Sequence, residues 1–152
     1  MSLPLMKSEL LERIKVLIEK RMNTSWEAME AAKNSANEEG KSSAGDKYET
    51  ARAMGQLDRE MNGRMYEQAR QERLLLDKIN LKDTFNQIAF GALVETSMGD
   101  FFVTIGAGII DYKGKNIMII SPQSPIGQVL MKKHINESFE FRGKTHQILS
   151  II

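Results

Sequence analysis

The segment Glu39-Gly40-Lys41-Ser42-Ser43-Ala44-Gly45 separates two long stretches that are rich in helix-forming residues. Its two glycines and two serines favour a turn, and the Asp46 that follows is a residue type that caps helices. No proline occurs between Pro4 and Pro122, so no proline breaks a helix on either side of this turn. The sequence therefore predicts the tip of a helical hairpin.

Apolar side chains recur at helical spacing on both sides of the predicted tip. The first arm runs from about Ser8 to Glu38, and its stripe consists of Leu10, Ile14, Leu17, Ile18, Met22, Met29, Ala32 and Ala36. The second arm runs from about Asp46 to Asp77, with Tyr48, Ala51, Met54, Leu57, Met61, Met65 and Ala69 as its stripe. Each arm of about 31 residues is about 45 Å long. The two stripes predict one packed seam that includes five of the ten methionines. Gly55 and Gly63 should let the two arms approach each other closely.

The pattern changes after Asn80, where β-branched and aromatic residues begin to alternate with polar ones. Strands are predicted at 88–96, 101–107 and 115–120 as successive antiparallel neighbours, with turns at 98–100 and 112–114. Ser124-Pro125 predicts the start of a short helix, and a hairpin is expected about Gly143 from strands at 138–142 and 144–152. We predict an α+β fold of two domains, a helical hairpin over 1–80 and an antiparallel sheet with one short helix over 81–152.

Composition excludes several classes of protein. The 152 residues contain no cysteine, and 21 basic residues nearly balance 20 acidic ones, which gives a net charge of +1. Disulfides and thiolate metal sites are therefore excluded, and we expect no direct binding to duplex DNA. No apolar run approaches the roughly 20 residues that span a bilayer. We expect a cytoplasmic monomer that does not enter the membrane.

Motifs for catalysis are weak. Gly40-Lys41-Ser42 lacks the first glycine of a phosphate-binding loop, and His134 and His146 have no partner at metal-ligand spacing. No serine lies in a nucleophile-elbow pattern. The expectation is a protein with no catalytic residues, no metal site and no cofactor of its own.

Two stretches resemble the Gre family of bacterial transcript-cleavage factors. Residues 120–133, ISPQSPIGQVLMKK, and 137–141, ESFEF, are similar to the strand and Ser-Pro helix of the family's FKBP-like C-terminal domain. Residues 40–48 overlay the family's hairpin tip, where Gly40 and Tyr48 match, and Ala51, Arg52 and Arg64 follow its second arm. The resemblance covers nearly the whole chain and implies that RNA polymerase is the partner.

The resemblance also implies a division of labour. In that family the C-terminal domain grips the rim of the polymerase's secondary channel, and two carboxylates at the hairpin tip help to hold magnesium at the polymerase active site. Lys41 and Ala44 occupy the corresponding tip positions here and cannot ligate a hard cation. Glu38, Glu39 and Asp46 lie nearby, and could assist the metal from a shifted loop or serve only as helix-end and capping residues.

The contact loop departs less from the family pattern. Ser124 and Pro125 match it, whereas Gln123 replaces the usual acidic residue. We expect a channel-binding elongation factor with weak or no stimulation of transcript cleavage. One alternative is an inhibitor or competitor of cleavage factors, and another is a coiled-coil adaptor. A peptidyl-prolyl isomerase is disfavoured, because Phe90, Phe101, Phe102, Phe139 and Phe141 alternate as core residues and do not cluster with a tryptophan.

Overall fold

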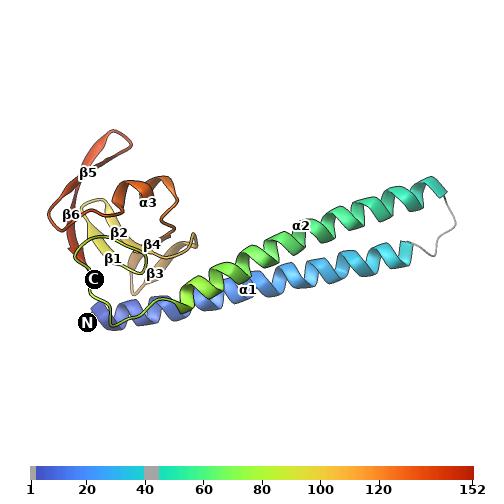
Figure 1. Cartoon of the computed structure of the whole chain (residues 1–152), viewed down its shortest axis with the longest axis horizontal. Coiled ribbons are helices and arrows are strands. Elements are labelled where there is room, and N and C mark those ends of the chain that lie inside the picture. The colour runs from blue at the N-terminus through green and yellow to red at the C-terminus, as the bar shows by residue number, and fades with distance from the viewer. Residues whose placement is uncertain (1–2, 40–44) are drawn as a thin grey trace. The chain divides into compact units, whose positions relative to one another are not determined.

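The structure, a computed structural model, describes residues 3–39 and 45–152, with side chains described to residue 34 and from residue 49. Two long helices come first, α1 (Leu3–Glu39) and α2 (Gly45–Asp77), followed by six strands and one short helix. The predicted α+β class is confirmed: a helical hairpin precedes a mostly antiparallel sheet (Figure 1). Contacts divide the chain into two compact units. The hairpin unit is Val16–Arg73, and the sheet unit joins Met1–Lys15 to Leu74–Ile152.

In the hairpin unit, α1 and α2 pack along a seam that combines small and polar residues with a few larger apolar side chains. Ile18, Ser25 and Ala69 are buried, and a Cβ added to Gly63 would lie 3.5 Å from Met29 Sδ. The predicted close approach at Gly63 is thus confirmed. Ion pairs join the two helices at the edges of the seam, with Arg73 Nε 3.0 Å from Glu19 Oε1. These contacts hold the hairpin with little apolar burial.

The α2 face of this seam differs from the prediction. Met54, Leu57, Met61 and Met65, predicted to be packed, are each more than half exposed. Partly buried positions instead include Ala51, Gly55 and Tyr66. Small residues let the helices approach each other closely, so the seam follows glycine and alanine and leaves the longer apolar side chains to one side. Of the predicted α1 stripe, Leu10, Ile14 and Ile18 are fully buried, the first two in the sheet unit, whereas Leu17 is 39% exposed.

The sheet contains strands β1 (Leu93–Thr96), β2 (Gly99–Val103), β3 (Gly108–Tyr112), β4 (Lys115–Ile120), β5 (Ser138–Phe141) and β6 (Lys144–Ile151), in the order β3-β4-β2-β1-β6-β5. The prediction missed β3, and it was wrong to make β2 and β4 antiparallel neighbours. They pair in parallel, with Asp100 beside Ile117. The connection between them is long enough for parallel pairing because β3 lies within it and pairs antiparallel with β4.

Two predicted hairpin turns are confirmed by their backbone. Lys113 and Gly114 both have positive φ, as do Arg142 and Gly143, the pattern of a type I′ turn that matches the twist of antiparallel strands. Residues 88–92, predicted as the beginning of a strand, lie before β1. Ile88 there exchanges backbone hydrogen bonds with Lys132 and Lys133 after α3 (Pro125–Leu130).

The core of the sheet unit contains Ile88, Ala92, Val94, Phe101, Val103, Leu130, Phe139 and Ile148, all nearly or fully buried. Helix α3 contributes Leu130 to this cluster, and Ile126 and Val129 pack against it. The predicted burial of Phe101, Phe102 and Phe139 is confirmed, whereas Phe90 and Phe141 are only partly buried. This core fixes α3 on the sheet and presents its other face to solvent.

Candidate functional site

The candidate site is the turn that begins α3, because it contains the predicted contact residues Gln123, Ser124 and Pro125. Ser124 is the N-cap, with an extended backbone, and Pro125 occupies the first helical turn. The Ser124 hydroxyl accepts a hydrogen bond from Gly127 N at 3.1 Å and donates one to Ser121 O at 2.7 Å. The predicted serine cap is therefore confirmed.

Gly127 is required by the same turn. A Cβ at this position would lie 2.1 Å from Ser121 O and 2.9 Å from Pro122 O, closer than atoms without a bond between them can approach. The backbone of 121–122 thus folds directly over the first turn of α3. The only sequence signal for this requirement is the glycine of Ser-Pro-Ile-Gly at 124–127, and no role was predicted for Gly127.

The solvent-facing side of the turn is uncharged. Gln123, Pro125 and Gln128 are exposed, and Gln128 Nε2 donates to Gln123 O at 2.9 Å. This bond holds the turn together on its solvent side, and the serine cap holds it together on its inner side. The exposed chemistry of this turn is two amides and a proline ring.

The segment after α3 is cationic at its start and neutralised further along. Lys132 is exposed and adopts a positive φ, and Lys133 follows it. His134 Nδ1 then lies 2.7 Å from Glu137 Oε1, and Glu137 also accepts from His134 N. These bonds from His134 lower the pKa of Glu137. The sequence did not lead us to expect this pair, which is exposed and at i, i+3 spacing.

Two charged side chains are buried elsewhere in the sheet unit. Burial lowers the pKa of Lys7, against the opposing effect of nearby Asp83, and Lys7 Nζ donates to Ile152 O at 3.0 Å. Asp100 is paired with Lys115 at 2.8 Å, and its hydrogen bond raises the pKa of Lys115. Both groups are in structural ion pairs or hydrogen bonds, and periodicity gave no sign of either.

The tip residues are not part of this geometry. Lys41 and Ala44 lie outside the described residues, and so do the side chains of Glu38, Glu39 and Asp46. By backbone, Glu38 and Glu39 belong to the last turn of α1 and Asp46 to the first turn of α2. Their expected roles at a metal stay predictions.

Within 3–39 and 45–152, no three acidic, histidine or cysteine side chains come together as a metal site would require. No helix in that part of the chain combines the length and apolar character needed to cross a bilayer.

Comparison with known proteins yields only a distant structural likeness. No family model matches the chain, and no curated protein matches it either. Among solved structures, the chain is similar to one described as the transcription factor Gfh1, with 14% identical residues and a TM-score of 0.35. The likeness covers 90% of this chain and 92% of that one. At this distance a functional assignment has to come from the residues themselves.

Proposed function

We propose that this protein is a Gre-like elongation factor that binds RNA polymerase at its secondary channel and adds little to transcript cleavage. The observation that carries the proposal is the capped Ser124-Pro125 turn, in a stretch whose residues 120–133 resemble the family's contact region. Its exposed amides and proline form the contact, and the hairpin enters the channel. The partner is therefore the polymerase itself, and duplex DNA is not contacted.

The geometry of the turn supports a docking role. A surface that binds without rearrangement avoids the entropic cost of ordering a loop, and here the cap, Gly127 and the Gln128 bond already fix the backbone. The Ser124 hydroxyl makes its hydrogen bonds within the turn, so the role of Ser124 is to position Gln123 and Pro125. Gln123 offers a neutral amide where the family has a carboxylate, which weakens the attraction to a basic rim.

The tip sequence supports the second half of the proposal. Stabilising a second magnesium ion needs anionic oxygen ligands, and Lys41 and Ala44 supply none. A lysine repels the metal, so the hairpin would occupy the channel without completing the site. The same feature favours a second candidate function: a channel-binding inhibitor that competes with cleavage-stimulating factors.

Binding is tested with the full chain and purified bacterial RNA polymerase on a biosensor. Gln123→Arg should weaken binding about tenfold or more by opposing a basic rim, and Gln123→Glu should strengthen it several-fold. Gln147→Arg is the matched control, because Gln147 is also an exposed glutamine of the sheet unit but lies on β6. Absence of binding by the full chain, or equal effects of the two arginine variants, would contradict the proposal.

The activity is tested on backtracked complexes of the same polymerase. The wild type should add little RNA cleavage, and Lys41→Asp combined with Ala44→Glu should raise it. Strong cleavage by the wild type that is lost in Asp46→Asn would instead assign the carboxylate role to Asp46. A separate factor that stimulates cleavage can then be added. If this protein suppresses that cleavage in proportion to its occupancy of the polymerase, the inhibitor function is supported.

A further inference from the structure

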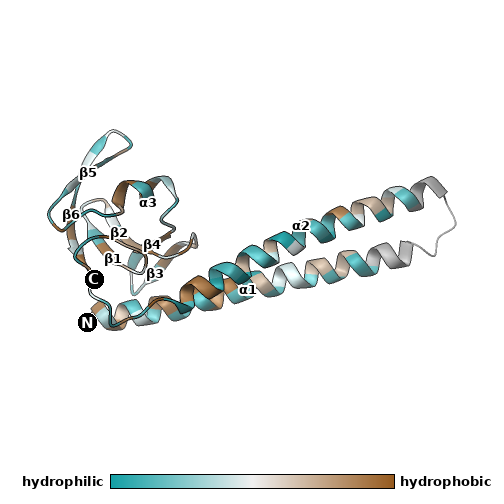
Figure 2. Ribbon diagram, in the orientation of Figure 1, coloured by the Kyte–Doolittle hydropathy of each residue, from teal (hydrophilic) through white to brown (hydrophobic). Residues whose placement is uncertain are grey.

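An apolar stripe lies exposed along the middle of α2. It consists of Met54, Leu57, Met61 and Met65, which are 60%, 62%, 52% and 52% exposed, and it is called the methionine stripe below. The spacing of three, four and four residues places all four side chains on one helix face about 16 Å long. Figure 2 shows apolar positions recurring along this part of α2 among polar ones. A contiguous exposed apolar face is the kind of surface that marks an interaction site.

The methionine stripe is separate from the seam that holds the hairpin. With 3.6 residues per turn, the stripe lies about a quarter-turn round α2 from the seam positions Ala51, Gly55 and Ala69. At its C-terminal end it reaches a groove of about 490 Å³ between α1 and α2, whose lining combines Leu17, Met65 and Ala69 with polar and charged side chains such as Lys20 and Glu72. The stripe is therefore the apolar face, and methionine side chains adapt readily to a packed partner.

Charges beside the stripe indicate which partner fits. Glu60 and Arg64 are both exposed and lie one turn apart on the flank away from the seam. If a second α2 packs antiparallel with Met61 at the two-fold axis, Leu57 faces the second copy's Met65. Glu60 then lies beside the second copy's Arg64, and symmetry repeats the pair. The face is thus complementary to itself in charge.

We propose that the methionine stripe docks a second copy of this chain, with the two α2 helices antiparallel. The stripe is smaller than the roughly 800 Å² per partner of a standard stable interface, so the dimer should form only at about 10–100 μM. The proposal departs from the expectation of a monomer only at high concentration. The inference does not depend on the proposed function. Dimerisation would regulate that function, since paired hairpins could not enter a channel.

Sedimentation equilibrium on the full chain tests the proposal over about 1 μM to 1 mM. The average mass should rise towards twice the 17.2 kDa of the chain. Met61→Glu places two like charges at the axis and should keep the protein monomeric, while its circular dichroism stays unchanged because the site is exposed. Gln56→Glu is the control, because Gln56 is exposed on α2 outside the stripe. A wild type that stays monomeric to 1 mM, or a Met61→Glu dimer, would overturn the proposal.

Charge exchange tests the antiparallel register. Glu60→Arg alone and Arg64→Glu alone should each weaken dimerisation by up to about fivefold, the scale of an exposed ion pair. The double variant should restore it, because each arginine again meets a glutamate across the axis. If the single variants have no effect, or the double variant is weaker than both, then the antiparallel register is wrong.

Discussion

The sheet unit and the hairpin unit are stabilised in different ways. Side chains such as Val94, Phe101 and Ile148 are fully buried in a continuous core. The hairpin unit buries Ile18 but otherwise packs mainly on small residues, and leaves apolar side chains such as Leu57 exposed. Hydrophobic burial scales with apolar area removed from water, so the sheet unit gains more from it per residue. The hairpin depends more on backbone hydrogen bonds, close approach and surface ion pairs.

The largest expected effect comes from truncating one packed side chain in each unit. Phe101→Ala should cost about 3–5 kcal/mol, as expected for a large side chain removed from a full core. Met29→Ala, at a partly buried position against Gly63, should cost about 1–2 kcal/mol. Urea denaturation followed by hydrogen exchange in each unit measures both. Equal losses would mean that the hairpin is packed as tightly as the sheet.

The next effect concerns the turn before α3. Gly127→Ala should cost about 2–3 kcal/mol, because the added Cβ collides with the Ser121 carbonyl and the overlap can be relieved only by moving backbone. Gln128→Ala, its exposed neighbour, should stay within about 0.5 kcal/mol. Thermal denaturation of the pair separates close packing from the loss of a side chain. A stable Gly127→Ala variant would show that the turn yields easily.

A smaller effect is expected from the cap itself. Ser124→Ala removes the hydroxyl that accepts from Gly127 N and should cost about 1 kcal/mol. Ser124→Thr keeps the oxygen and should lose less. Urea midpoints with an unchanged slope would confirm a local effect, and an alanine variant as stable as wild type would show that the cap contributes nothing.

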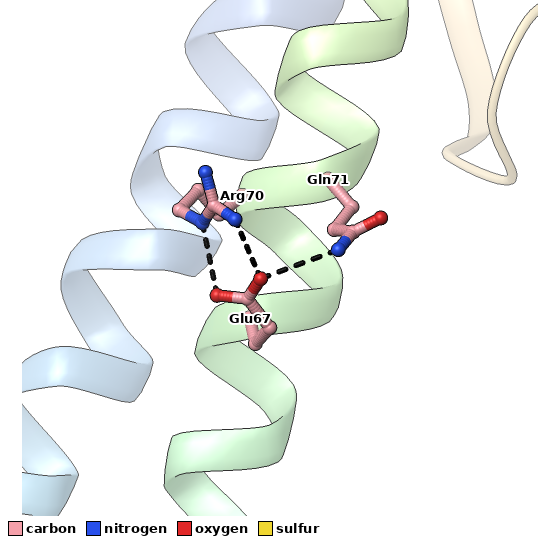
Figure 3. A network of polar contacts seen from close by, with 3 residues as sticks. All are labelled: Glu67, Arg70 and Gln71. Atoms are coloured by element: carbon pink, nitrogen blue, oxygen red, sulfur yellow. Dashed lines mark hydrogen bonds and ion pairs between the residues drawn. The ribbon is translucent and has the colours of Figure 1, made fainter.

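The smallest effect lies on the surface of the hairpin. Glu67 accepts hydrogen bonds from Arg70 and Gln71 (Figure 3), and these lower its pKa from 4.5 to about 2. Because the folded pKa is depressed, the stabilisation is complete above about pH 4.5 and disappears as the pH falls towards 2. The carboxyl resonance of Glu67 in a carbon NMR titration should therefore show a midpoint near 2.

Two variants complete that measurement. Arg70→Ala should move the midpoint back towards 4.5, because the largest cause of the shift is lost. Glu67→Gln should remove the part of the acid-induced decrease in helix stability that comes from protonation of Glu67. A midpoint that does not respond to Arg70→Ala would assign the shift to another group.

The accuracy of the sequence predictions followed how local each signal was. The Ser124 cap and the turns at Gly114 and Gly143 were predicted correctly, because each depends on residues within a few positions of one another. The α2 seam was not, since periodicity shows where apolar residues recur but not which of two adjacent faces meets the partner. Leu57 and Met61 have the spacing of a seam, and Gly55 forms it.

Longer-range features were harder to predict. The parallel pairing of β2 and β4 depends on β3 being inserted between them, and Ile109 and Ile110 were too short an apolar run to identify that strand. At the candidate site the sequence predicted the Ser124 cap and the helix start at Pro125 correctly, while their role in binding stays a prediction. Gly127 had no predicted role, because its closeness to Ser121 appears only when the chain folds back. The His134–Glu137 pair followed an i, i+3 spacing that could have been considered.

The edge of the sheet at β3 has a consequence for work with fragments. An unpaired edge strand is a template for other chains, and in the sheet unit Arg13 Nη1 donates to Asp111 O at 2.7 Å while Tyr112 donates to Glu9. The first turns of α1 thus contact the β3 edge and should prevent it from pairing with the edge strand of another chain. A fragment starting at residue 81 would lose both contacts and leave the exposed Ile109 at an open edge. We expect it to aggregate as its concentration rises, which light scattering would detect.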